Sequence, residues 1–137
     1  MPITYAGVLS SDIYNANITT TGADTTDSDS FDLQNIEGTA LLGINDRASG
    51  TAAATIAVTH SEDDSTFVAI PAAALFTPST GIAATFTALS TSASEQFLGL
   101  HLQLLKRYVR VEFTGTDIDH NVAVVLTGGK QYSGGIG

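Results

Sequence analysis

The chain has 137 residues, of which 14 are acidic and 5 basic, so its formal net charge is −9. This length predicts one domain with its own hydrophobic core, and the absence of cysteine excludes disulfides and thiolate metal sites. Nucleic acid is not an expected partner, because lysine and arginine drive binding to phosphate backbones. A membrane is not expected either, because no apolar run approaches the ~20 residues of a membrane span.

Residues 1–29 are predicted to form an extended N-terminal arm that ends in a polar loop. Ile3 to Leu9 and Ile13 to Ile18 have the composition of short strands, and the following Thr- and Asp-rich stretch has few groups to bury. Termini of this kind are poorly ordered unless a partner holds them. We therefore expect the arm to make contacts outside the domain.

Residues 30–137 are predicted to form one β-sandwich domain with a short Gly-rich C-terminal tail. Short segments with alternating apolar and polar residues recur at the spacing typical of sandwiches and barrels. The alternation is clearest from Glu95 to Gly128, which we take as the folding centre. The segments are residues 30–33, 38–45, 52–60, 66–70, 83–89, 97–104, 108–113 and 122–127, the last of which is apolar on both faces.

Helices have little room in this pattern. Pro71 to Gly81 contains two prolines and accommodates at most one helical turn. No other stretch has the length and period of a domain-sized helix, which argues against a parallel βαβ fold. The predicted fold is an all-β, jelly-roll-like antiparallel sandwich of about eight strands.

Two acidic clusters are candidate metal sites. The first contains Asp24, Asp27, Asp29 and Asp32, whose oxygens are of the type that Ca²⁺ prefers, but the glycine and closing glutamate of an EF-hand are absent. We interpret this cluster as a solvated loop. The second contains Asp117, Asp119 and His120, and it would need convergent ligands from elsewhere in the chain. No metal or cofactor is assigned.

The residue types of a catalytic triad occur together at His60, Ser61 and Asp63. Neighbouring residues on a strand point to opposite faces, so His60 and Ser61 are poorly placed as base and nucleophile. His101 shares a mixed strand face with Phe97 and is interpreted as a half-buried strand residue. No catalytic residue is assigned, and we predict that the protein is not an enzyme.

Three of the five basic residues lie close together, at Lys106, Arg107 and Arg110. One interpretation pairs Arg110 with Glu112 or with an acid on the neighbouring strand. The other is a contact with an acidic patch on a neighbouring subunit, where charges commonly set the register of docking. The sequence leaves both open.

Three stretches resemble small structural proteins of tailed bacteriophages. Residues 30–44 contain a polar-flanked strand followed by an apolar one, and residues 60–67 (HSEDDSTF) are similar to an H/E-S-x-D-G-x-x-F hairpin of that group. Asp64 stands where the group has glycine, which puts the hairpin turn in doubt. Residues 106–113 (KRYVRVEF) are like the K-R-Y-V-R-V strand of the same proteins.

The resemblance implies a capsid decoration, or cement, protein of the virion. Such a protein is made in the host cytoplasm, binds the major capsid protein on the outer capsid surface and forms a homo-oligomer, with a trimer favoured. The arm would then dock on the capsid or clasp a neighbouring copy. The expected contact residues are Ile3, Tyr5, Val8, Leu9, Tyr14, Lys106, Arg107 and Arg110.

Two other functions stay open. One is a structural component of a phage tail or neck. The other is a carbohydrate-binding β-sandwich, which we consider weaker because such modules stack sugars on aromatic platforms, whereas this chain has no tryptophan and only 7% aromatic residues.

Overall fold

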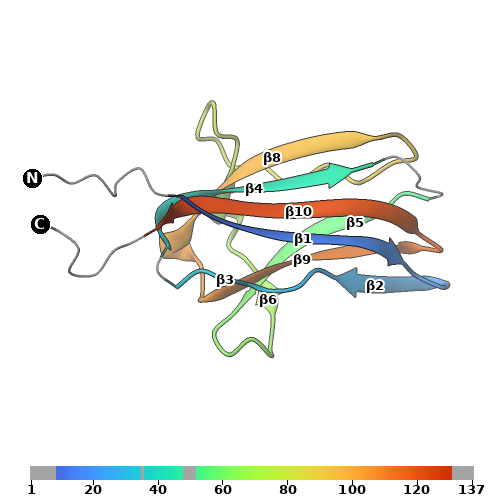
Figure 1. Cartoon of the computed structure of the whole chain (residues 1–137), viewed down its shortest axis with the longest axis horizontal. Helices are drawn as coiled ribbons and strands as arrows, with labels where there is room; N and C mark the ends of the chain where they lie inside the picture. Colours follow the sequence, from blue (N-terminus) through green and yellow to red (C-terminus); the bar gives the residue numbers. More distant parts are fainter. Residues whose placement is uncertain (1–8, 35, 48–51, 131–137) are drawn as a thin grey trace, which may run out of the picture.

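The structure is a computed structural model, and it describes residues 9–34, 36–47 and 52–130. Within these residues, ten strands form two antiparallel sheets packed face to face (Figure 1). Sheet A has the order β1 (Leu9–Thr19), β10 (Asp119–Lys130), β4 (Ile36–Asp46), β8 (Ser94–His101) and β7 (Leu75–Phe76). Sheet B has the order β2 (Ala23–Asp27), β9 (Tyr108–Thr116), β5 (Thr55–Ser61) and β6 (Val68–Ala69), with β3 (Phe31–Asp32) also beside β9.

The strand order is that of a jelly roll. The first strand pairs with the last, β2 pairs with β9, β4 with β8, and β5 with β6, so the chain is folded back on itself as a double ribbon. That ribbon then wraps into two sheets, because β10 also pairs with β4 and β9 with β5. The predicted jelly-roll-like β-sandwich is confirmed.

Helical structure is limited, in the described ranges, to two single 3₁₀ turns, η2 (Ala72–Ala74) and η3 (Leu102–Leu104). The predicted single turn between the prolines corresponds to η2. Among the described residues, no helix is long and apolar enough to cross a membrane.

The core lies between the sheets and is built by the alternation seen in the sequence. Every second residue of a strand points to the same face, so Leu42 and Leu126 of sheet A meet Val111 and Phe113 of sheet B in a single buried cluster. Each of these four side chains is fully buried. The outward-facing residues of sheet A alternate with these buried ones along the strands, so the packed core holds them in place.

The N-terminal region contains the strand predicted at Ile13 to Ile18, and it differs from the sequence prediction in the polar stretch that follows. Within residues 1–29, the stretch 9–19 is strand β1, which pairs with β10 along its whole length, and residues 23–27 form the edge strand β2. Ile18 is buried in the core, which anchors β1. The sequence predicts a loop at Ala23–Asp27 because its residues are polar, whereas the structure has a strand there. An edge strand with one solvated side tolerates that composition.

Several other predicted strands are shorter in the structure, and two of them show the reason. The alternation of 97–104 ends as a strand at His101, and the Leu105 N–H then bonds the Leu102 carbonyl at 3.0 Å to close η3. The predicted strand 83–89 forms only isolated bridges, Phe76 with Ala83 and Ala54 with Leu89. Alternation alone indicates an extended chain, whereas a ladder also needs a neighbour with free backbone groups.

Candidate interaction surface

The outward-facing side of sheet A carries a continuous apolar band. The strand registers place Ile13, Val125, Gly43 and Phe97 in one row across four strands. An adjacent row runs through Thr127, Leu41, Gly99 and Phe76. Neither row contains a charged residue. We call these two rows the A face.

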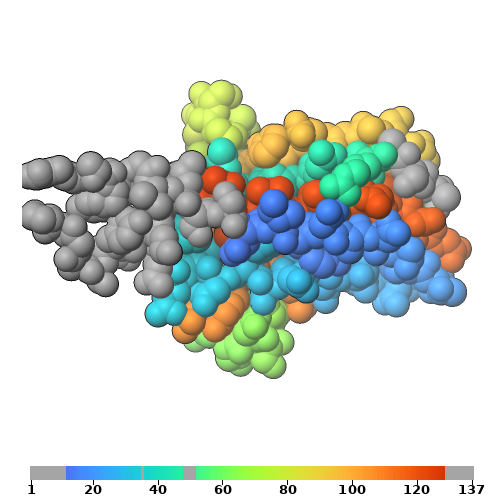
Figure 2. Space-filling view, viewed as in Figure 1, coloured from blue at the N-terminus to red at the C-terminus, as the bar shows by residue number. Residues whose placement is uncertain are grey.

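Three apolar side chains of the A face are exposed to solvent. Ile13 is 66% exposed, Phe97 51% and Leu41 43%. Figure 2 looks onto this side of the molecule, with β1 in blue and β4 in blue-green on either side of β10 in red. Single exposed apolar residues are normal on protein surfaces, but a contiguous apolar patch marks an interaction site.

Two aromatic rings of the A face lie over glycines on neighbouring strands. A Cβ atom on Gly43 would collide with the ring of Phe97, and one on Gly99 would collide with the ring of Phe76. Phe76 also stacks on His101, with the ring centroids 4.2 Å apart. Glycine at each position therefore leaves the space that the neighbouring ring occupies.

One end of the A face is polar. Arg47 follows β4 and donates through Nη1 to the side-chain oxygens of Asn15 (2.8 Å) and Asn121 (2.5 Å). Asn121 in turn donates to Asn17 Oδ1 at 2.7 Å. An apolar centre with a hydrogen-bonded polar border is the usual arrangement of a protein–protein interface.

The predicted arm residues fall in different places. Ile3, Tyr5 and Val8 lie outside the described residues. Leu9 begins β1. Tyr14 points inward and packs against the core, and its burial, with help from the charges of two nearby aspartates, raises the pKa of its phenol. Tyr14 therefore holds β1 to the sandwich rather than reaching outward.

The two predicted arginines make ion pairs within the chain. Arg107 donates from Nε and Nη2 to both carboxylate oxygens of Asp32, at 3.0 and 2.9 Å, which lowers the pKa of that carboxyl. Arg110 pairs with Glu112 at 3.1 Å and with Asp27 at 3.4 Å, and its guanidinium lies 4.0 Å above the Phe67 ring. Arg110 therefore pairs both with Glu112 and with an acid on the neighbouring strand, as one of the two interpretations open from the sequence predicted.

Lys106 contributes its backbone to the fold. Its N–H donates to Nδ1 of His60 at 3.1 Å. Desolvation by burial and the nearby Lys106 charge both lower the pKa of His60. The imidazole therefore serves as an acceptor that fixes the segment between η3 and β9.

The acidic cluster of the N-terminal region is distributed rather than convergent. Asp27 and Asp32 face the two arginines described above, and the Asp24 carboxylate accepts the N–H of Thr25 at 2.8 Å. Within the residues that the structure describes, no three His, Asp or Glu side chains are grouped so as to hold a metal ion.

The second acidic cluster is also separated by the fold. The Asp117 carboxylate accepts the Gly22 N–H at 2.7 Å, which joins the β1–β2 turn to the β9–β10 turn. His120 instead points inward.

The residues of the candidate triad, His60, Ser61 and Asp63, are likewise divided, because Ser61 Oγ donates to Asp63 at 2.7 Å while His60 accepts from Lys106.

The buried pair of Asp46 and His120 was not predicted. The imidazole Nδ1 lies 2.9 Å from Asp46 Oδ2, and Nε2 lies 2.5 Å from the carbonyl oxygen of Ala52. Both side chains have no exposed surface. The pair joins the end of β4, the start of β10 and the segment before β5. Its sequence signal is weak, since the two residues are 74 positions apart.

Comparisons with known proteins support the fold. No family model and no curated protein matches the chain. Among solved structures, the crystal structure of the SPBc2 prophage-derived protein YomS is similar, with a TM-score of 0.55 over 93% of this chain and 98% of that chain. The two sequences are 12% identical. The chain therefore has the fold of a protein derived from a prophage.

Proposed function

We propose that this protein is a bacteriophage head decoration protein that binds the outer capsid surface and stabilises the shell. Its partner is the major capsid protein, and it acts as a homo-oligomer, for which a trimer is favoured. The support comes from the resemblance of three sequence stretches to phage virion proteins and from a fold like that of the prophage-derived protein YomS.

The A face is the observation that carries the proposal. The chain has a net charge of −9, yet it presents a band of exposed Ile13, Leu41 and Phe97 without a single charge. Apolar surface contributes roughly 25 cal/mol for each Å² removed from water. A rigid apolar sheet face is suited to a permanent contact, which is what a cement protein needs.

The energetics of decoration depend on many copies. A standard protein interface buries ~1,600 Å² in total. An oligomer that engages several capsid subunits at once gains avidity, because the second and third contacts are effectively intramolecular. Moderate burial on each A face is therefore sufficient to retain the protein on the shell and to oppose separation of capsid subunits.

Binding to undecorated phage heads tests this function. The purified full-length protein is incubated with heads that lack decoration, and the copies bound per head are counted after sedimentation. We expect saturable binding at a fixed stoichiometry and heads that release their DNA at a higher temperature. Binding to purified tails or necks with none to heads would contradict the proposal, and so would binding to glycans alone.

A further inference from the structure

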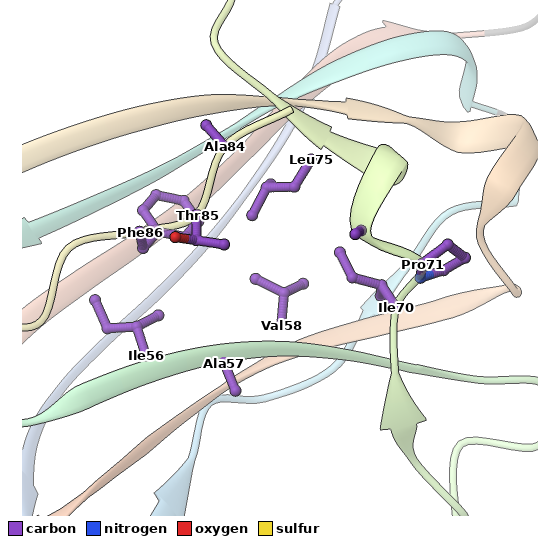
Figure 3. Close-up of a pocket in the computed structure, with 10 residues that line it drawn as sticks. Ile56, Ala57, Val58, Ile70, Pro71, Leu75, Ala84, Thr85 and Phe86 are labelled. Carbon is purple, nitrogen blue, oxygen red and sulfur yellow. The ribbon is translucent and has the colours of Figure 1, made fainter. Parts of the chain in front are cut away.

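An apolar cavity opens between the two sheets at the edge formed by β5, β7, the residues that follow β6 and the segment 84–86. Its volume is about 260 Å³, and its walls include Ile56 and Val58 of β5, Ile70, Leu75 and Phe86. Figure 3 shows these side chains around the empty centre, with Thr85 as the one hydroxyl among them. Small-molecule sites are usually ~300–1,000 Å³, so this cavity suits one or two apolar side chains better than a free ligand.

The same edge has a stretch of strand without a neighbour. β6 covers β5 only at Thr59 and His60. On that side the Val58 carbonyl accepts the Ile70 N–H at 3.4 Å. Further along, Ala54 exchanges two bonds of 3.0 and 2.8 Å with Leu89.

Ile56 lies between these two contacts. Backbone groups alternate in direction along an antiparallel strand, so the N–H and C=O of Ile56 point away from β9 and toward the cavity edge. In the part of the chain that the structure describes, no ladder partner lies beside Ile56 on that side. An incoming extended segment would complete the sheet there.

The N-terminal segment of the chain has the right chemistry to fill this gap. Residues 1–8 (MPITYAGV) directly precede β1, and Ile3 and Tyr5 alternate with Thr4. A segment with this alternation presents its apolar residues to one face when extended. One of these side chains would enter the cavity while the backbone pairs with Ile56.

Distance favours a second copy as the source of that segment. β1 and β7 are opposite edges of sheet A, so four strand spacings of ~4.8 Å, or ~19 Å, separate them. Reaching β5 also requires a turn around the edge into a second sheet ~10 Å away. Eight extended residues span at most ~26–29 Å, so the chain's own N-terminus has no length left to lie along β5.

We propose that the cavity and the open stretch of β5 bind residues 1–8 of a neighbouring copy of this protein. The donor edge at β1 and the acceptor edge at β5 are different surfaces, so the contact is heterologous. Heterologous contacts that close generate cyclic rings, such as a trimer. This inference rests on the homo-oligomer of the proposed function and assigns its contact, but it does not depend on what the oligomer binds.

Disulfide trapping tests the proposal directly, because the natural chain has no cysteine. A tagged Tyr5→Cys protein and an untagged Thr85→Cys protein are unfolded, refolded together and oxidised. We expect a mixed disulfide between the two chains on a non-reducing gel. The matched control replaces Thr85→Cys with Thr66→Cys, an exposed threonine in the turn before β6, and it should give only background cross-linking.

Two outcomes overturn the proposal. One is a mixed disulfide no stronger with Thr85→Cys than with Thr66→Cys. The other is a Tyr5→Cys/Thr85→Cys double variant that closes its disulfide within single chains, which would place the segment in its own cavity.

Blocking the mouth of the cavity, where the exposed Thr85 lies, gives an independent measurement. Thr85→Trp should reduce the oligomer to a monomer in light scattering, as should deletion of residues 2–8, whereas Thr87→Trp, on an exposed threonine outside the cavity, should keep the natural mass. A Thr85→Trp protein that melts normally and keeps its oligomeric mass contradicts the proposal. If the mixed disulfide between Tyr5→Cys and Thr85→Cys forms but the natural protein does not bind phage heads, only the decoration function is refuted.

Discussion

At the scale of single residues, the turn after β5 contains an aspartate in a backbone conformation that favours glycine. Asp64 has φ +58°, a left-handed conformation that favours glycine, and glycine is what the resembling phage proteins have there. Aspartate tolerates this region better than most residues. The neighbouring Asp63 carboxylate accepts the N–H groups of Ser65 and Thr66 at 3.0 and 2.9 Å, which fixes the turn.

The turn should lose its structure at low pH. Hydrogen bonds from Thr66, Ser61 and Ser65 lower the pKa of Asp63 to about 2 from an ordinary value of 3.8. A carboxyl with a depressed pKa in the folded state stabilises the turn above pH 3.8, and that contribution is lost as the pH falls through about 2.

Amide NMR shifts of Ser65 and Thr66 measure this transition, and we expect a midpoint near pH 2. Asp63→Asn keeps an acceptor oxygen and should abolish the titration while preserving the turn. A midpoint at the ordinary aspartate value would show that the turn hydrogen bonds are not formed.

The buried pair in the core predicts a large stability effect. His120→Ala removes the imidazole that contacts Asp46 and leaves that carboxylate buried without it. Breaking a buried pair in this way typically costs ~3–5 kcal/mol, measured as the free energy of unfolding in urea. The control is His101→Ala, a half-buried histidine on the A face side, which should cost much less. Similar losses for both variants would contradict the structural role of the pair.

At the scale of elements, the sequence predicted the central strands and missed their polar neighbours. Period-two alternation predicts the stretches that contain β4, β5, β8 and β9, because each of these strands buries one face, and a run that is apolar on both faces predicts β10. The strand β2 (ADTTD) carries no apolar pattern, and its pairing depends on backbone groups and on contacts such as that between the hydroxyls of Thr25 and Thr114 at 2.8 Å. Those contacts join residues far apart in the sequence.

The A face was equally hidden from sequence reasoning. Its rows combine single residues from different strands, and only the registers bring Ile13, Val125 and Phe97 together. The small share of charged residues in the sequence, 14%, is the one available signal. The sequence instead suggested the basic cluster as a contact with a partner, although both of its arginines pair with acids of the same chain.

The two ring-covered glycines should respond differently to substitution. In both cases an added methyl group meets an aromatic ring, but Phe76 is held by His101 whereas Phe97 is half in solvent and can rotate away. We expect Gly99→Ala to cost ~1–3 kcal/mol, the usual range for overpacking, and Gly43→Ala to cost less. Urea unfolding of both variants measures the difference, and a larger loss for Gly43→Ala would contradict the ring positions.

At the scale of the whole molecule, the ion-pair networks and the exposed apolar band lie on different sheets. The two arginine networks lie on sheet B, where each guanidinium is balanced by carboxylates. Sheet A instead offers its apolar band. Because molecules with a net charge of −9 repel one another, an uncharged face is where such a chain can pack closely against a partner. The A face is therefore the central element of the proposed function.

Head binding by two isoleucine variants tests that claim most directly. Ile13 on the A face and Ile82 on the loop after β7 are 66% and 67% exposed, so Ile13→Asp and Ile82→Asp change the same residue at equal exposure. We expect Ile13→Asp to weaken binding to undecorated heads at least about tenfold, which corresponds to ~1.4 kcal/mol, because a carboxylate would be buried in the contact. Ile82→Asp should bind as the natural protein does. Equal binding by both variants would contradict the assignment of the A face to the capsid.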